Sequence, residues 1–300
     1  MFSQRIVCAY LYIITKHGYP PEVSGIFSYL EEMRNLGFQS IELEGIHEKN
    51  ILEMYEIRHD VRKALDEKSL NVPFYCVVLP GLSSPDQIIR EDNLAIFRKG
   101  CETAIALGAK GVLDNAPIPP YLFPKNIPIV RHYDDEILLS AGFPNNLSWK
   151  KHWTGLIETY KAACRIASEY NLTYLMHPCF GALSSTTDAF LYFADAVGED
   201  NLRFNLDTAN QYYLKDNLLL SLIRLKDRID YIHISDNDGI KPGHFAVGKG
   251  KINWEIFGET LSKIGFKGDF GLDIGGAETR ITDLDEAYIS SANFIERWIK

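Results

Sequence analysis

Residues 201–236 read NLRFNLDTANQYYLKDNLLLSLIRLKDRIDYIHISD, and their pattern is the clearest guide to the architecture of the chain. Two short β-type runs, RFNLD and YIHIS, stand near its two ends, and a longer stretch with helical spacing of apolar residues lies between them. This order is typical of two parallel strands joined by a crossover helix. Each run also carries a side chain that can bind a metal, Asp207 in the first and His233 in the second.

The same alternation of short β-type runs and amphipathic stretches extends in both directions to the ends of the chain. We expect strands at residues 5–14, 40–44, 72–78, 111–114, 173–177, 203–207, 231–235 and 269–274. Helical periodicity is clear in the intervening residues 26–38, 93–109, 153–170 and 254–266. Eight such units in 300 residues predict an α/β fold, a (β/α)8 TIM barrel that forms a single domain over residues 1–300.

Two irregular segments follow predicted strands and should lie at the rim where barrels carry their active sites. The first, at about 115–153 after the fourth strand, is long and rich in Pro and aromatic residues. Its mixed run at 131–136 is interpreted chiefly as a solvated face. The second, at about 236–252 after the seventh strand, is polar and Gly-rich and leads into a last helix near Asn253.

Composition narrows the class of protein. Apolar residues make up 46% and charged residues 24%, as in ordinary globular proteins. The net charge of -9 opposes a large nucleic-acid footprint, and no run reaches the length of a membrane span. The five cysteines are scattered and odd in number, which favours reduced thiols and a cytoplasmic location. We therefore expect a small-molecule ligand, with no nucleic-acid or membrane partner.

Four consecutive strands end in potential metal ligands: His177, Asp207, His233 and Asp273, spaced 26 to 40 residues apart. Such spacings match single βα units, so the four side chains should converge at one mouth of the barrel. Two imidazoles and two carboxylates favour Mn2+, with Zn2+, Co2+ or Mg2+ as alternatives.

Each ligand has a structural alternative. His177 alone fits a hydrogen-bonded structural residue, Asp207 fits a helix N-cap, and Asp273 fits a salt bridge. His233 stands inside an apolar strand, where an ionisable group is costly without a partner. Asp236, just beyond it, is a candidate to anchor its second nitrogen or to bind a substrate hydroxyl.

Further candidates surround this set. Glu42 and Glu44 are two residues apart in the second strand and so point to the same face. One of them is a candidate base and the other a candidate substrate clamp. Alternatively, one forms an ion pair at the floor of the barrel and the other lies in solvent. His244, in the second rim loop, is a candidate acid or substrate contact, or else a solvated loop residue. Trp254 is one of several aromatic residues that fit either a sugar-stacking wall or the core. The others are Tyr10, Tyr12, Trp153 and Phe180.

At these residues the sequence resembles the xylose isomerase-like superfamily of sugar phosphate isomerases and epimerases, which also contains the endonuclease IV group. The resemblance covers most of the chain and is clearest at NLRFNLDTAN (201–210), YIHISDNDG (231–239) and HFAVGKGKINWEIFGETLSKIGFKGDFGLDI (244–274). The last stretch is similar to the family pattern of a G-x-G turn, an I-x-W helix start and a final strand that ends in an acid.

For the epimerase branch, the resemblance implies a metal held by acids from strands five, six and eight and by the strand-seven His, which are positions 177, 207, 273 and 233. Family members usually have Glu at the fifth and eighth positions, where it also moves the proton, whereas this chain has His177 and Asp273. Asn210 stands where many relatives carry a substrate-binding His. The third strand, VPFYCVVLPG, lacks the His of the nuclease branch, which argues against DNA cleavage.

The resemblance implies a metal-dependent sugar or sugar phosphate isomerase or epimerase that acts through an enediolate on a ketose or keto-sugar. The base would be His177, Glu42 or Asp273, with His244 as a further proton donor. One alternative is a lyase that cleaves a 3-keto-glycoside, as relatives do together with a small partner subunit. Another is a non-catalytic sugar-binding barrel. Family members often form homo-oligomers, so a homo-oligomer and a small partner subunit both stay open.

Overall fold

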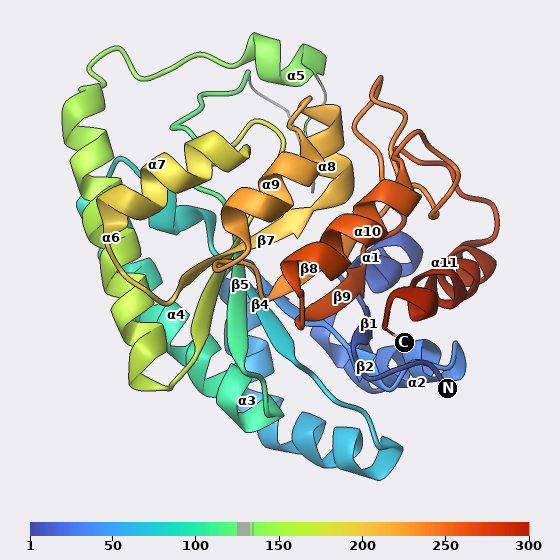
Figure 1. The fold of residues 1–300 in the computed structure, drawn as a ribbon. Helices are drawn as coiled ribbons and strands as arrows, with labels where there is room; N and C mark the ends of the chain where they lie inside the picture. The colour runs from blue at the N-terminus through green and yellow to red at the C-terminus, as the bar shows by residue number, and fades with distance from the viewer. Residues whose placement is uncertain (125–132, 134, 300) are drawn as a thin grey trace.

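Parallel strands form one continuous sheet in the computed structural model, which describes residues 1–124, 133 and 135–299 (Figure 1). The sheet runs in the order β2-β1-β9-β8-β7-β6-β5-β4-β3. The strands are β1 (Ile6–Cys8), β2 (Ser40–Ile41), β3 (Leu43–Ile46), β4 (Phe74–Val78), β5 (Gly111–Asn115), β6 (Thr173–His177), β7 (Leu202–Asp207), β8 (Tyr231–Ile234) and β9 (Asp269–Leu272).

The barrel closes through a single interrupted strand. β2 pairs with β1, and β3 pairs with β4, while only Glu42 separates β2 from β3. The backbone N–H of Glu42 still donates to the carbonyl of Cys8 (2.9 Å). The nine strands therefore occupy eight barrel positions, which confirms the predicted (β/α)8 TIM barrel.

Most of the helices surround the strands on the outside, whereas α5 (Asp135–Ser140) lies at the rim (Figure 1). The helices are α1 (Leu11–His17), α2 (Ile26–Asn35), α3 (His47–Lys68), α4 (Gln87–Leu107), α5, α6 (Trp149–Glu169), α7 (Thr187–Val197), α8 (Thr208–Tyr213), α9 (Leu218–Leu225), α10 (Trp254–Ile264) and α11 (Leu284–Ile299). The two ends of the chain meet where the backbone N–H of Ser3 donates to Glu296 of α11 (3.0 Å). No helix in the described part of the chain is both long and apolar enough to cross a membrane.

Two expected elements differ from the structure. The strand expected at 5–14 ends at Cys8, and the apolar run that follows it forms α1 from Leu11. A short apolar run reads equally well as a buried helix, because periodicity alone does not separate the two. The helix expected last begins at Trp254 after its N-cap Asn253, but α11 follows it.

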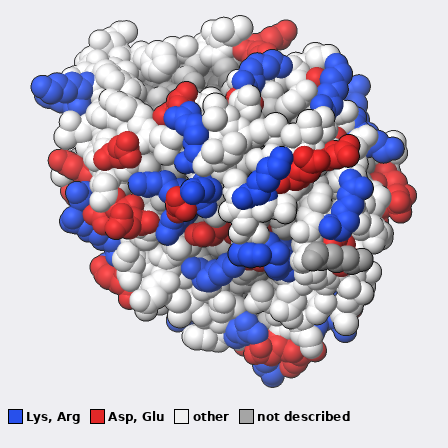
Figure 2. All heavy atoms as spheres, in the orientation of Figure 1, with Lys and Arg blue, Asp and Glu red and all other residues white. Residues whose placement is uncertain are grey.

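The two rim segments can be placed in part. The segment at 115–153 contains α5 and the start of α6, and its residues 125–132 and 134 lie outside the described residues. Half of the run at 131–136 therefore falls outside them, and its Asp135 and Glu136 are exposed in the first turn of α5. On the face shown in Figure 2, Lys and Arg side chains are interspersed with Asp and Glu, so charge of one sign is not gathered there. None of the five cysteines, all in the described part, forms a disulfide.

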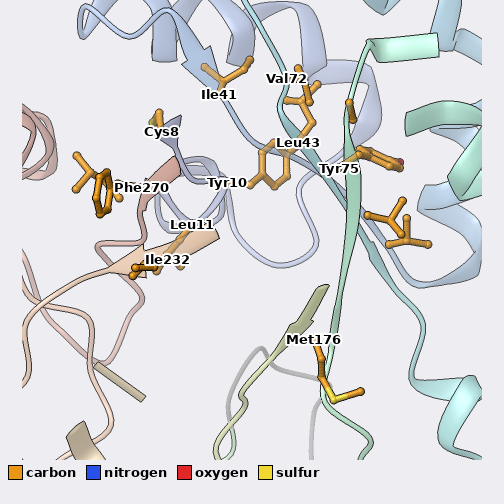
Figure 3. Packing of buried hydrophobic residues seen from close by; sticks show 14 of the residues in the cluster. Cys8, Tyr10, Leu11, Ile41, Leu43, Val72, Tyr75, Met176, Ile232 and Phe270 are labelled. Atoms are coloured by element: carbon orange, nitrogen blue, oxygen red, sulfur yellow. The ribbon is translucent and has the colours of Figure 1, made fainter. Parts of the chain in front are cut away.

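Side chains fill the barrel in the alternating pattern expected of strands. Along β4, Phe74 and Cys76 point into the barrel, whereas Tyr75 belongs to the layer between strands and helices. Figure 3 shows part of this outer layer, with Ile41 and Leu43 from the two halves of the interrupted strand. Inside the barrel, Phe74 stacks on the Tyr231 ring with centroids 4.4 Å apart. This packed interior supports the rim above it.

Leu175 tests the packing of the interior, because it is fully buried among the side chains that fill the barrel. We expect Leu175→Ala to lower the free energy of unfolding by about 2–5 kcal/mol, since it leaves a cavity. Urea titration measures this change. Ile240→Ala, at a residue that is 67% exposed, is the control and should change it by less than about 0.5 kcal/mol. Equal losses in the two variants would contradict the described packing.

Candidate metal centre

Four adjacent strands bring the predicted ligands to one rim of the barrel. His177 and Asp207 are the last residues of β6 and β7, His233 lies in β8, and Asp273 directly follows β9. All four strands are parallel, and Asp207 is paired with His233 in register. Each of the four residues is nearly or fully buried, with at most 5% of its surface exposed.

One oxygen of Asp207 lies at the centre of this group. Asp207 Oδ2 is 3.9 Å from His177 Nε2 and 4.0 Å from His233 Nδ1. Asp273 Oδ2 lies 3.9 Å from the same His233 nitrogen. These separations are too long for hydrogen bonds. The Asp207 oxygen is therefore close to both histidine nitrogens without a hydrogen bond to either.

His244 joins the group from the loop after β8. The loop folds back on itself and forms two isolated antiparallel β-bridges. One pairs the backbone of His244 with that of Gly275, and the other pairs Phe245 with Asp236. His244 Nε2 lies 3.7 Å from Asp207 Oδ2 and 3.5 Å from Asp273 Oδ2. The sequence marks His244 only as a candidate acid or substrate contact, because no periodicity places a loop residue in space. The structure puts it among the ligand atoms.

The ligand atoms form two groups that share Asp207, one with His177 and His233 and one with His244 and Asp273, and within each group they lie within 4.8 Å of one another, as the ligands of a divalent metal ion do. Metal–nitrogen and metal–oxygen bonds of about 2.1 Å separate two ligands by at most about 4.2 Å. The five separations above, 3.5 to 4.0 Å, all fall within this limit. Asp207 Oδ2 and His233 Nδ1 are buried and have no hydrogen-bond partner among the described residues. An unpartnered buried carboxylate oxygen is costly, and a cation would satisfy it.

Hydrogen bonds behind the site aim the two strand histidines. The Nδ1–H of His177 donates to Asn205 Oδ1 (2.9 Å), which leaves Nε2 facing the centre. The Nε2–H of His233 donates to Glu42 Oε2 (3.0 Å), which leaves Nδ1 facing the centre. Partners of this kind fix the ring and tautomer of metal-binding histidines. Asn205, a polar residue inside the apolar run RFNLD, was not identified as a candidate from the sequence.

Asp207 combines the two roles that its position suggests. Its Oδ1 accepts a hydrogen bond from the backbone N–H of Asn210 (2.7 Å) and so caps α8, while its Oδ2 faces the centre. Asn210 is also near the site, with its Nδ2 3.5 Å from His177 Nε2 and donating to the carbonyl of Pro178 (2.9 Å). One carboxylate therefore both caps the N-terminus of α8 and offers an oxygen to the candidate metal site.

Glu42 and Glu44 lie close together but differ in setting. Their carboxylates and the Cys76 thiol approach within 4.8 Å of one another. Glu42 is buried and bonded to His233, which makes it a partner of a ligand. Glu44 lines a small cavity beside the centre, together with His177, His233 and Asp273.

Asp236 and Trp254 lie away from this cavity, contrary to expectation. Asp236 Oδ2 accepts hydrogen bonds from Trp254 Nε1 and the backbone of Gly248, both at 2.8 Å. Its Oδ1 accepts from the backbone of Ile252 (3.1 Å). Trp254 packs against Phe257 and Trp298. Asp236 therefore holds the loop that carries His244, and the second nitrogen of His233 is bonded to Glu42 instead.

Mutual electrostatics set the charges of the ligands. Burial alone would lower the pKa of His233, but nearby carboxylates, Glu42 foremost, raise it to about 9. Burial alone would raise the pKa of Asp207, whereas His244 and His177 lower it below its usual value. Burial lowers the pKa of His177, so this ring is neutral at pH 7. Without metal, His233 therefore carries a proton at pH 7.

The charge on His233 predicts how metal affinity depends on pH. A metal binds only the neutral imidazole, so a proton must leave His233 at any pH below about 9. We expect the apparent affinity to rise about tenfold per pH unit from pH 7 to pH 9 and then to level off, as measured by competition with a chelating dye. Glu42→Gln removes the main cause of the raised pKa and should move the plateau to lower pH. A flat profile in the wild type would contradict this.

Comparison with known sequences identifies a family. The sequence model of the family described as "Xylose isomerase-like TIM barrel" matches residues 30–298. A D-psicose 3-epimerase of Enterocloster bolteae is 24% identical over 88 residues, which are 29% of this chain and 28% of that protein. The curated relatives are matched over only 24% and 28% of their own length.

Comparison with solved structures shows the same barrel over the whole chain. The 3-keto-D-glucoside 4-epimerase YcjR from E. coli superposes with a TM-score of 0.73 at 16% identity, covering 98% of this chain and 100% of that one. The D-allulose 3-epimerase from Methylomonas sp. also gives 0.73 at 16% identity, covering 99% of both chains. At this identity the likeness establishes a shared fold.

Proposed function

Because the chain belongs to the xylose isomerase-like TIM barrel family, we propose that it is a metal-dependent isomerase or epimerase of a ketose or keto-sugar. The observation that carries the proposal is the pair of buried ligand groups that share Asp207 at the carboxyl ends of β6 to β9, one with His177 and His233 and one with Asp273 and the loop residue His244. The sugar epimerases with the same fold support it. The catalytic face of TIM barrels is this same rim.

The donor set favours Mn2+, with Zn2+, Co2+ or Mg2+ as alternatives, because nitrogen and carboxylate oxygen ligands are mixed. His177, Asp207, His233 and Asp273 would hold the ion, and His244 is positioned as a fifth ligand. When bound, such an ion polarises a carbonyl oxygen and neutralises the negative charge that develops on it.

Glu44 and Asp273 are the carboxylates among the described residues that line the small cavity. We assign them the movement of the proton at the carbon beside the substrate carbonyl. Glu42 is buried behind His233 and acts as a positioning residue. Glu44 thus takes the proton-transfer role that the sequence suggested for Glu42.

The substrate sugar is proposed to be unphosphorylated. No Lys or Arg lines the small cavity or the larger one beside it, as far as the chain is described. The small cavity has Glu44 and Asp273 in its wall, and these would repel a phosphate. A neutral sugar meets no such repulsion.

Proton exchange tests the proposed reaction directly. The metal-loaded protein is incubated in heavy water with ketohexoses and 3-keto-glucosides and followed by NMR. We expect deuterium at the carbon beside the carbonyl without cleavage of the sugar. Release of the aglycone would indicate the lyase alternative, and the absence of both exchange and cleavage would contradict an enzymatic role on these sugars.

Two neighbouring carboxylates should respond differently to the same substitution. Glu44→Gln should lower kcat for exchange by about 10²- to 10⁴-fold while metal affinity is retained, because a proton carrier is lost. At pH 9, where protons compete little for His233, Glu42→Gln should weaken metal binding by about 10- to 100-fold, with kcat largely recovered at excess metal, since it only orients His233. Kinetics and metal titration on both variants measure this. Identical behaviour of the two variants would refute the division of roles.

A further inference from the structure

A second, larger cavity adjoins the candidate metal centre. It has a volume of about 340 Å³, against about 30 Å³ for the small cavity beside the ligands. The two share Tyr19, Val78, Asn115 and Cys179 in their walls. They are therefore neighbouring compartments at the same rim of the barrel.

The small cavity holds only a part of any sugar derivative. A volume of about 30 Å³ holds only a few waters, because one water needs about 10–15 Å³ by this measure. The reacting carbonyl and its neighbouring hydroxyl would fill that space. The remainder of the substrate must extend into the larger cavity, whose volume is in the range of sites that hold drug-sized ligands, from about 300 Å³ upward.

The wall of the larger cavity is mostly apolar and aromatic, with Ser83, Ser84 and Asn115 as its other polar members beside His47. Aromatic and Pro residues contribute to it from the segment after α1 and from the loops that follow β5 and β6; they include Tyr19, Pro119, Tyr121, Phe123 and Phe180. The hydroxyl of Tyr121 donates to the carbonyl of Gly181 (2.9 Å), which ties two of these loops together. None of the described lining residues is Asp, Glu, Lys or Arg. Such a wall suits an apolar ring better than a row of sugar hydroxyls.

His47 adds a buried polar atom to this wall. His47, directly after β3, lines the cavity, and its Nε2 is buried without a hydrogen-bond partner among the described residues. Its backbone has φ +60°, a left-handed conformation that costs about 1–3 kcal/mol in a residue other than Gly. Burial lowers the pKa of His47, so the ring is neutral at pH 7. A polar substituent on a bound apolar group would satisfy this nitrogen.

We propose that the larger cavity binds an uncharged, aromatic-ring-sized group attached to the sugar, so that the substrate class is a keto-glycoside with an aryl aglycone. This inference rests on the proposed function, because it places the reacting end of the same substrate at the metal centre. The aglycone packs against Phe180 and Phe123, and His47 offers one hydrogen bond to a polar atom on it.

Equilibrium binding separates this inference from the proposed reaction. Isothermal titration of the metal-loaded protein with phenyl 3-keto-glucoside and methyl 3-keto-glucoside compares ligands that differ only in the aglycone. We expect the phenyl compound to bind about 30-fold more tightly, because one apolar ring leaves water. Phe180→Ala should reduce that ratio about tenfold without changing the affinity for the methyl compound. Phe180 is only partly buried, and Phe123→Ala serves as a second variant.

Tyr192→Ala is the matched control, because this aromatic residue is 68% exposed and does not line the cavity. It should leave the ratio unchanged. Equal affinities of the wild type for the two glucosides, or a ratio that neither cavity variant alters, would overturn the inference. Heavy-water exchange with both compounds is read separately. Deuterium exchange together with equal affinities for the phenyl and methyl compounds would support the proposed function and contradict the aryl subsite. Tighter binding of the phenyl compound without exchange would contradict the proposed function and support the subsite.

Discussion

A single buried oxygen, Asp207 Oδ2, sets the constraint on which the functional rim depends. This oxygen is shielded from water and accepts no hydrogen bond from the described residues. The pKa of the Asp207 carboxyl is nevertheless lowered below its usual value. An ionised carboxylate in such a place requires positive charge nearby. His177, His233 and His244 surround it at 3.7 to 4.0 Å, and a divalent ion bound between Asp207, His177 and His233 would satisfy it.

The surrounding barrel is built to hold these rings in place. Glu42 stands at the break between β2 and β3, on the opposite side of His233 from Asp207, and Asn205 orients His177 from within β7. Gly271 in β9 has no side chain that would collide with the His233 ring. The loop that carries His244 is pinned by Asp236 to backbone groups and to Trp254. Residues distant in sequence thus position three imidazoles around one carboxylate.

Much of the fold and part of the site could be predicted from local sequence patterns. Short β-type runs locate the strand ends, and parallel strands necessarily bring His177, Asp207, His233 and Asp273 to one rim. The helix at Leu11 was missed because a buried apolar run has no distinguishing period. The positions of His244 and Trp254 depend on how a Gly-rich loop folds back, which involves contacts between segments far apart. For the same reason, the partner of the second His233 nitrogen was misassigned to nearby Asp236 rather than to Glu42, 191 residues away.

The central claim is that these side chains form one metal centre with a defined choice of ring nitrogens. Anomalous diffraction from crystals of the Mn2+-loaded protein tests it most directly. The predicted result is one peak within about 2.3 Å of His177 Nε2, His233 Nδ1 and oxygens of Asp207 and Asp273. The absence of a peak between these residues, or a metal bound through His177 Nδ1 or His233 Nε2, would contradict it.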